Sequence, residues 1–327
     1  MNHTPKPNFF VIGVVKGGTT SLYHYLLQHP DIYLPPIKET NHFAAKDIRE
    51  SDFLPEYAMD VKIDLDAYIR SGMKRQVHIA HVNDRNQYEK LFSKVKDESA
   101  IGEISNCYMI CPSAAREIHD YAPGAKIMVV LRNPIHRAWS QYLMNLREAK
   151  DGDGGFIAAL EADRDRTKTG WGVNHQYLEL GRYASQLKRY FDLFGRENVL
   201  VMFYEEYRQS PAQVMKEICR FLGVDDGFEF DFSEESNKAG MPRSAALNKM
   251  LVKSGAIKAL KGITPKSVRK KFAQALYTDK NLPRIAENEK AWLAEYYSEE
   301  MRELENLIGD GVPRWWPEFK TSNHEIR

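Results

Sequence analysis

The stretch FFVIGVVKGGTTSLYHYLLQHP, residues 9–30, joins an apolar run to an amphipathic segment through a lysine, two glycines and two threonines. The apolar run predicts a buried strand over Phe9–Val14, and apolar residues at helical spacing predict a helix over Thr19–Gln28. Glycines after a buried strand let backbone N–H groups converge on an anion, and the helix adds its positive end. The stretch therefore predicts an anion site whose members are Lys16, Gly17, Gly18, Thr19, Thr20 and Ser21.

The order of these residues differs from that of the nucleotide-binding P-loop. That loop places its lysine after the last glycine, as G-x-x-x-x-G-K-[ST], whereas Lys16 precedes both glycines. The order also removes the hydroxyl that usually binds Mg²⁺. A P-loop kinase or NTPase is an alternative, and it would need a Mg²⁺-binding carboxylate at a second strand end. The strand KIMVVLR (Lys126–Arg132) contains none, although Glu103 ends another strand.

Strands and helices alternate along the chain. Apolar runs predict strands over Ala100–Ile104, Lys126–Arg132 and Asn198–Tyr204. Helical spacing predicts helices over Asp84–Val95, Pro112–Tyr121, Pro134–Ala149, Tyr177–Phe194, residues 211–222 and Asn288–Leu307. The alternation predicts an α/β fold of three layers, a central parallel sheet flanked by helices, with a P-loop-like anion-binding loop. Ligands of such sheets bind beyond the carboxyl ends of the strands.

A second anion site is predicted where the strand KIMVVLR ends. Arg132 closes this strand, Asn133 and Pro134 turn the chain into a helix, and Ser140 follows eight residues after Arg132. A planar guanidinium can bind a phosphate through two hydrogen bonds, and a hydroxyl can complete the site. Taken singly, Arg132 could instead hold the carboxyl end of a helix and Ser140 could face the sheet. Because both motifs follow strands of one parallel sheet, we expect them to lie close together.

The two motifs together resemble the sulfotransferases that use 3′-phosphoadenosine 5′-phosphosulfate (PAPS). In that family K-x-G-T-T binds the 5′-phosphosulfate, and R-[ND]-P with a serine eight residues later binds the 3′-phosphate. GEISNCYM (102–109), residues 180–224 and PRS (242–244) are similar to further elements of the family. The resemblance implies transfer of a sulfuryl group from PAPS to a hydroxyl, or alternatively an amine, of a small-molecule, sugar or lipid acceptor. Adenosine 3′,5′-bisphosphate would be the product.

The resemblance also implies roles for residues. Lys16 would stabilise the charge that grows on the bridging oxygen as the nucleotide leaves. PPIKETNHF (35–43) resembles an element of the carbohydrate-type and bacterial branches in which a glutamate accepts the acceptor's proton, which points to Glu39, with His42 as the alternative. The carboxy-terminal K-G-x-x-G of the cytosolic enzymes is missing, and the position of Arg243 suggests that it completes the 3′-phosphate site. Ile104 stands where carbohydrate-type relatives often carry lysine.

The same resemblance implies one domain over residues 1–327. Its donor-binding core would span about 9–225, and acceptor-side and lid elements would span about 40–95, 147–173 and 235–285. No metal is implied, because lysine, arginine and backbone N–H groups meet the charges of the donor.

Composition narrows the remaining possibilities. The formal net charge of the 327 residues is +1, which predicts no nucleic-acid partner. Residues 240–278 nevertheless contain no acidic residue, so a peripheral membrane contact through 247–271 is an alternative to a solvated helix or lid. No apolar run is long enough to span a bilayer, no signal peptide is evident, and three cysteines favour a reducing compartment, so a cytoplasmic protein is expected.

A non-catalytic nucleotide-binding protein of the same fold is a further alternative. It is disfavoured because Lys16, Glu39, Arg132 and Ser140 are all present. Binding of the donor without transfer to any acceptor would favour it again.

Overall fold

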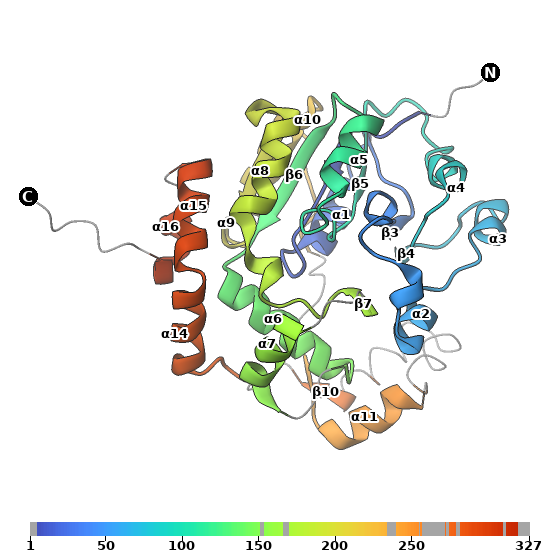
Figure 1. Ribbon diagram of the computed structural model, residues 1–327. Helices are drawn as coiled ribbons and strands as arrows, with labels where there is room; N and C mark the ends of the chain where they lie inside the picture. Colours follow the sequence, from blue (N-terminus) through green and yellow to red (C-terminus); the bar gives the residue numbers. More distant parts are fainter. Residues whose placement is uncertain are drawn as a thin grey trace, which may run out of the picture.

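A parallel sheet of five strands runs through the computed structural model (Figure 1). In spatial order the strands are β2 (Ile32–Tyr33), β5 (Ala100–Ile104), β1 (Phe9–Val11), β6 (Lys126–Leu131) and β8 (Val199–Phe203), and every pairing is parallel. The structure describes residues 5–150, 154–165, 170–233, 240–254, 256, 272, 275–278, 282–309 and 312–319. Because β1 is the central strand, the loop that follows it leaves the middle of the sheet.

Helices cover both faces of this sheet. Those of the first half are α1 (Thr19–Leu26), α2 (Pro55–Val61), α3 (Leu65–Arg70), α4 (Arg85–Lys90), α5 (Ala114–Tyr121), α6 (Pro134–Arg147) and α7 (Gly155–Asp165). Those of the second half are α8 (Tyr183–Phe194), α9 (Tyr204–Gln209), α10 (Pro211–Leu222), α11 (Ala245–Lys253), α14 (Glu287–Tyr296), α15 (Ser298–Ile308) and α16 (Val312–Trp315).

Successive side chains of the strands enter two separate apolar layers. Phe10 and Val129 belong to the layer formed with α5, α6, α8 and α15, whereas Phe9 and Val130 belong to the layer formed with α1 and α10. Strands buried on both faces need apolar side chains at every position, which explains the continuous apolar runs in the sequence. The predicted three-layer α/β fold with a central parallel sheet is confirmed.

Five short strands lie outside the main sheet. β3 (Ile37–Glu39) and β4 (Val77–Ile79) form a parallel pair in which Glu39 lies opposite Ile79. α2, α3 and α4 lie on this side of the molecule (Figure 1). β9 (Met241–Pro242) pairs antiparallel with β10 (Tyr277–Thr278), and β7 spans Gly170–Val173.

Some predicted boundaries are wrong. The single helix expected over Asn288–Leu307 is two helices, α14 and α15, that meet at Tyr297. The hydroxyl of Tyr297 donates a hydrogen bond of 2.9 Å to the carbonyl oxygen of Leu178. The predicted start of the preceding helix is wrong as well, because α8 begins at Tyr183 rather than Tyr177. The helix expected over Asp84–Val95 is shorter too, because α4 ends at Lys90.

The carboxy-terminal helices pack against the main layer and reach the end of β8. Trp316 is fully buried between the rings of Tyr183 and Phe203. Its indole N–H donates a hydrogen bond of 3.1 Å to Oε2 of Glu205, which follows β8. The end of the described chain thus supports one of the loops at the carboxyl edge of the sheet.

Candidate active site

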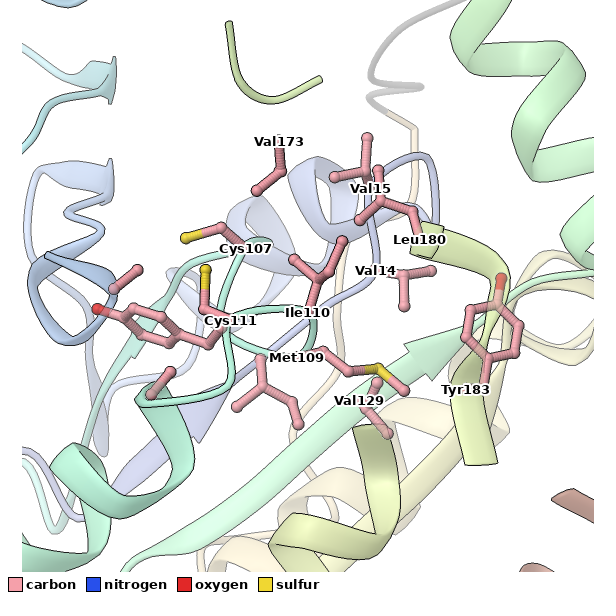
Figure 2. Close-up of a cluster of buried hydrophobic side chains, with 14 of the residues drawn as sticks. Val14, Val15, Cys107, Met109, Ile110, Cys111, Val129, Val173, Leu180 and Tyr183 are labelled. Atoms are coloured by element: carbon pink, nitrogen blue, oxygen red, sulfur yellow. The ribbon is translucent and has the colours of Figure 1, made fainter. Parts of the chain in front are cut away.

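The loop between β1 and α1 is fixed by apolar packing beneath it. Val14 and Val15 are buried, and Figure 2 shows them in the cluster that also contains Met109 and Ile110. The backbone of Gly17 lies so close to β6 that a Cβ there would be 2.6 Å from the carbonyl oxygen of Val130. A side chain at this position would therefore push the loop away from the sheet.

Two residues of the loop have left-handed backbone conformations. Gly18 is the N-cap of α1 with a φ of 88°, which glycine adopts without strain, and Lys16 has a φ of 67°, which is uncommon for a residue with a side chain. Thr19, Thr20 and Ser21 form the first turn of α1, which carries no acidic residue. The positive end of α1 is therefore free of a competing carboxylate from its own first turn.

The ammonium group of Lys16 is half-buried among other cations. Its Nζ atom lies 3.7 Å from Sδ of Met144 on α6. Desolvation, followed by the nearby guanidinium groups of Arg147 and Arg132, lowers the pKa of Lys16 to about 8. The group is therefore still mostly protonated at neutral pH, and its charge is concentrated in a cationic site.

Arg132 joins the two predicted anion motifs. Its guanidinium donates a hydrogen bond of 2.9 Å to the backbone oxygen of Lys16, 116 residues earlier in the chain. The same guanidinium lies over the ring of Tyr204, 4.5 Å from the centroid, and the Tyr183 hydroxyl donates to the backbone oxygen of Arg132 at 2.8 Å. The structure thus brings together the two strand ends whose motifs are predicted from the sequence to lie close together.

A pocket of about 430 Å³ opens beside this guanidinium. It is lined by Arg132, His136, Tyr204, Glu205, Arg208 and Gln209. Both carboxylate oxygens of Glu205 are already engaged, one by the backbone N–H of Asn133 at 3.2 Å and the other by Trp316. The pocket therefore offers two guanidinium groups and an imidazole, a set of donors that suits an anion.

One face of α6 connects this pocket to Lys16. His136, Ser140 and Met144 follow one another at intervals of four residues and so lie along one side of the helix. His136 lines the pocket, Met144 contacts Lys16, and half-buried Ser140 lies between them. The distance along the helix axis from His136 to Met144 is about 12 Å.

Sequence reasoning missed His136, Tyr204 and Arg208 in this pocket. The position of His136, four residues before Ser140, is a signal that could have found it. Tyr204 could have been found because it follows the carboxyl end of β8.

Glu39 is a buried carboxylate at the end of β3. Its Oε1 accepts a hydrogen bond of 2.9 Å from the side-chain amide of Asn106 and forms an ion pair of 2.6 Å with the buried ammonium of Lys38. Burial alone would raise the pKa of Glu39, but the charges of Lys38 and His78 outweigh it and the net pKa is lowered. The group is therefore held as an anion at neutral pH.

The residues around Glu39 are held by β5 and by the residue that follows it. The hydroxyl of Thr40 donates to Oε2 of Glu103 at 2.7 Å, and the backbone N–H of Asn41 donates to the hydroxyl of Ser105 at 3.1 Å. Burial raises the pKa of Glu103. Because this carboxyl group is fully buried and already bonded to Thr40, it is poorly placed to bind Mg²⁺, which disfavours the kinase or NTPase alternative at this strand end.

Three histidines lie near this segment, and they have different surroundings. His42 hydrogen-bonds through Nδ1 to the carbonyl oxygen of Val82 at 2.6 Å and stacks on Tyr88. His81 is buried, and its Nε2 lies 3.1 Å from the hydroxyl of Tyr57. His78, which sequence reasoning missed, is the one whose imidazole lies beside Glu39, with Nε2 3.9 Å from Oε1.

The remaining predictions concern the acid-free region. Arg243 follows β9 with an exposed side chain, and its backbone N–H donates to Leu276. α11 carries the first part of the 247–271 segment, and residues 257–271 lie outside the described residues. Within the described ranges no helix is long and apolar enough to cross a membrane, and no cluster of three or more His, Cys, Asp or Glu side chains is suited to a metal ion.

Known proteins that are similar to this chain in sequence or structure are named as sulfotransferases. A solved sulfotransferase from Alicyclobacillus acidocaldarius is 30% identical, with a TM-score of 0.70, and the match covers 95% of this chain and 99% of that one. Carbohydrate sulfotransferase 15 of Mus musculus is 23% identical over 291 residues, which are 80% of this chain and 51% of the relative.

The bifunctional heparan sulfate N-deacetylase/N-sulfotransferase 1 of Homo sapiens is 24% identical over 316 residues, which are 94% of this chain and 30% of that protein. The chain thus spans about half, or less, of the length of these curated relatives. The family model for the sulfotransferase domain matches residues 6–303 of this sequence, and so the chain belongs to the sulfotransferase domain family.

Proposed function

We propose that this chain transfers the sulfuryl group of PAPS to a hydroxyl group of an acceptor, with adenosine 3′,5′-bisphosphate as the second product. The observation that carries the proposal is the hydrogen bond between Arg132 and the backbone of Lys16. It joins two anion-binding motifs at neighbouring strand ends, as a donor with anionic groups at two positions requires. Family membership supports the same reaction.

The donor would lie along the exposed face of α6. Its 3′-phosphate would contact Arg132 and Ser140, with His136 and Arg208 of the adjoining pocket as further donors. Its 5′-phosphosulfate would meet the loop from Lys16 to Gly18 and the first turn of α1, whose members are Thr19, Thr20 and Ser21. Arg243 remains a proposed contact of the 3′-phosphate, supported by its place in the acid-free segment.

Two different side chains would act on the leaving oxygen and on the attacking hydroxyl. Sulfuryl transfer is an in-line displacement in which positioning and charge stabilisation supply most of the catalysis, as in phosphoryl transfer. Lys16 would stabilise the bridging oxygen as negative charge grows on it. Glu39 would accept the proton of the acceptor hydroxyl, a role supported by its fixed, anionic carboxylate.

For the acceptor we propose a carbohydrate hydroxyl as the first class to test. The support is that one curated relative is named for carbohydrates. The heparan sulfate relative is named as an N-sulfotransferase, so a carbohydrate amine is the alternative. Phenols and long-chain alcohols are the competing classes. We also propose that residues 1–327 form one domain with the acceptor side built by about 40–95, 147–173 and 235–285.

The donor site is tested by calorimetry with adenosine 3′,5′-bisphosphate. We expect wild-type protein to bind it, Arg132→Ala to weaken binding at least tenfold, and Arg302→Ala, an exposed arginine of α15, to leave it unchanged. ADP with Mg²⁺ should bind far more weakly. Preference for ADP with Mg²⁺, or equal affinity of the two arginine variants, would contradict the assignment.

Transfer itself is tested with radiolabelled PAPS. The acceptor panel contains a glucosamine-based oligosaccharide, 4-nitrophenol and a long-chain alcohol, and labelled product is separated by chromatography. Transfer to any member supports the proposed reaction and identifies the class. Tight nucleotide binding without transfer to the panel or to water would instead favour a non-catalytic nucleotide-binding protein.

A further inference from the structure

The imidazole of His78 lies between a buried carboxylate and solvent. β3 and β4 pair in parallel, and this pairing brings Nε2 of His78 within 3.9 Å of Oε1 of Glu39. The side chain of His78 is 65% exposed, whereas that of Glu39 is 12% exposed. A small rotation of the exposed ring, or one bridging water, suffices to connect the two groups.

Glu39 is poorly suited to keep a proton. The ammonium of Lys38 lies 2.6 Å from its Oε1 and is itself buried, so a protonated Glu39 would leave that cation without its partner. A carboxylate in this setting can take the acceptor's proton as the new S–O bond forms. It must then lose the proton before the next turnover, which requires a second group with access to water.

The other two histidines of this segment do not meet that requirement as well. The ring of His42 is engaged by the carbonyl of Val82 and by Tyr88. His81 is buried against Tyr57, and desolvation lowers its pKa to about 4. Of the three, His78 combines proximity to Glu39 with exposure to solvent.

We propose that His78 relays the acceptor's proton from Glu39 to solvent. The inference rests on the sulfuryl transfer proposed above. The acceptor oxygen forms a bond to sulfur while the bond between sulfur and the bridging oxygen of PAPS breaks, and the electron pair remains on the phosphate of the leaving nucleotide. The acceptor's proton passes to the carboxylate of Glu39, then to Nε2 of His78, and from the imidazolium to water. His78 acts through Glu39 and is a positioning residue in this step.

The charges that face His78 fit a transient proton carrier. Lys38 and Glu39 face it from β3, Glu148 from the end of α6 and Lys16 from the loop after β1. Partial desolvation lowers the pKa of His78, and Glu39 is the strongest of the groups that oppose this effect. The ring is therefore mostly neutral at pH 7 and can accept a proton. The carboxylates of Glu39 and Glu148 stabilise the imidazolium once it forms.

The experiment compares wild-type protein with His78→Ala, Glu39→Gln and the control His119→Gln, a histidine of α5. Turnover is measured from pH 5 to pH 9 with the panel acceptor that gives the highest rate, or as PAPS hydrolysis if water is the only acceptor. Each variant is also assayed with added imidazole. Calorimetry with adenosine 3′,5′-bisphosphate checks that the donor site is intact.

We expect His78→Ala to bind the nucleotide normally and to lose roughly tenfold or more in kcat. The acidic limb of its pH profile should lack the contribution of His78. Imidazole should restore activity to His78→Ala in proportion to its concentration, and it should not restore Glu39→Gln. Unchanged kcat and pH profile in His78→Ala would overturn the relay. A loss that imidazole does not restore would overturn it as well. Failure of the proposed function is distinguishable, because wild-type protein would then neither bind the nucleotide nor use PAPS.

Discussion

The charged side chain of Lys16 lies near two arginines. Desolvation lowers its pKa most, and the charges of Arg147 and Arg132 add to this effect. Like charges repel more strongly where water is scarce, so this arrangement is unfavourable without a bound anion. A polyanionic donor would relieve the repulsion and raise the pKa of Lys16. The charge on this residue should therefore depend on pH in the free protein and much less in the donor complex.

The first prediction concerns this charge. Lys16→Ala should lower kcat by roughly 10²–10³-fold, the range seen when one group that stabilises a transition state is removed, while nucleotide affinity changes by much less. In wild-type protein kcat/KM should fall as pH rises through about 8, because Lys16 loses its proton there. Lys16→Arg should remove this limb, since arginine stays protonated.

Steady-state kinetics between pH 6 and pH 10 measure both effects. Lys188→Ala, an exposed lysine of α8, is the control and should behave as wild type. Near-normal kcat in Lys16→Ala would show that another group stabilises the leaving nucleotide.

A second prediction concerns the ion pair between Lys38 and Glu39. Lys38→Met removes the cation that holds down the pKa of Glu39, so this pKa should rise and the acidic limb of kcat/KM should move to higher pH. The variant should be destabilised by roughly 3–5 kcal/mol at pH 8, where an unpaired carboxylate is buried. It should be less destabilised at pH 5, because a group whose pKa is raised by folding stabilises the protein below that pKa.

Thermal unfolding at the two pH values checks this result. The double variant Lys38→Met/Glu39→Gln is the matched comparison, and it should recover most of the lost stability because no charge is left unpaired. Equal destabilisation of both variants at both pH values would indicate that packing rather than charge explains the loss.

Site residues were predictable from sequence where a motif fixes them to a strand end. Lys16 and Arg132 follow apolar runs that form central strands, so their meeting could be expected before the structure was known. His78 could not be found in this way, because it reaches Glu39 through the pairing of two three-residue strands that lack a strong pattern. His42 remains a predicted alternative base. The left-handed Asn41 (φ 52°) precedes it, and its ring contacts Val82 and Tyr88.

At the scale of elements, the loop after β1 depends on its contact with β6. Gly17→Ala should force the loop away from β6, because the new Cβ would lie 2.6 Å from the backbone oxygen of Val130. We expect a loss of about 1–3 kcal/mol in the free energy of unfolding, the usual cost of overpacking. Nucleotide affinity should fall as well, because the N–H groups of the loop move.

Chemical denaturation and calorimetry measure the two effects of Gly17→Ala. Gly124→Ala is the matched control, since a Cβ there has open space around it. Retention of full nucleotide affinity in Gly17→Ala would mean that the loop backbone does not bind the donor.

Elements that are buried on both faces were easier to predict than boundaries that depend on a tertiary contact. β5, β6 and β8 are buried on both faces or nearly so, and their apolar runs mark them clearly. The break between α14 and α15 had no such mark, because both helices carry apolar residues at helical spacing across it. It reflects a tertiary contact, the hydrogen bond from Tyr297 to Leu178, which local pattern does not contain.

At the scale of the whole molecule, the carboxy-terminal residues complete the site although they lie beyond residue 303, where the match to the family model ends. Trp316 fixes Glu205, and Glu318 accepts a hydrogen bond of 2.9 Å from the side chain of Asn133, which caps α6. Trp316→Ala should therefore destabilise the protein by roughly 3–5 kcal/mol and weaken nucleotide binding at the Arg132 pocket.

Differential scanning calorimetry and nucleotide titration measure these effects. Trp316→Phe keeps most of the packing and loses the hydrogen bond to Glu205, so it should cost about 1 kcal/mol. A Trp316→Ala variant with wild-type stability and affinity would show that the segment after α15 is dispensable.

The spatial order of the strands also has a consequence for biosynthesis. β1 is synthesised before the other strands of the sheet, yet both of its neighbours, β5 and β6, are made much later. At about 5–20 residues per second, the interval between synthesis of β1 and completion of β6 is on the order of 6–24 seconds. During that time the apolar β1 lacks its partners and would be exposed to chaperones, so nascent chains that stop before residue 131 should be retained by them.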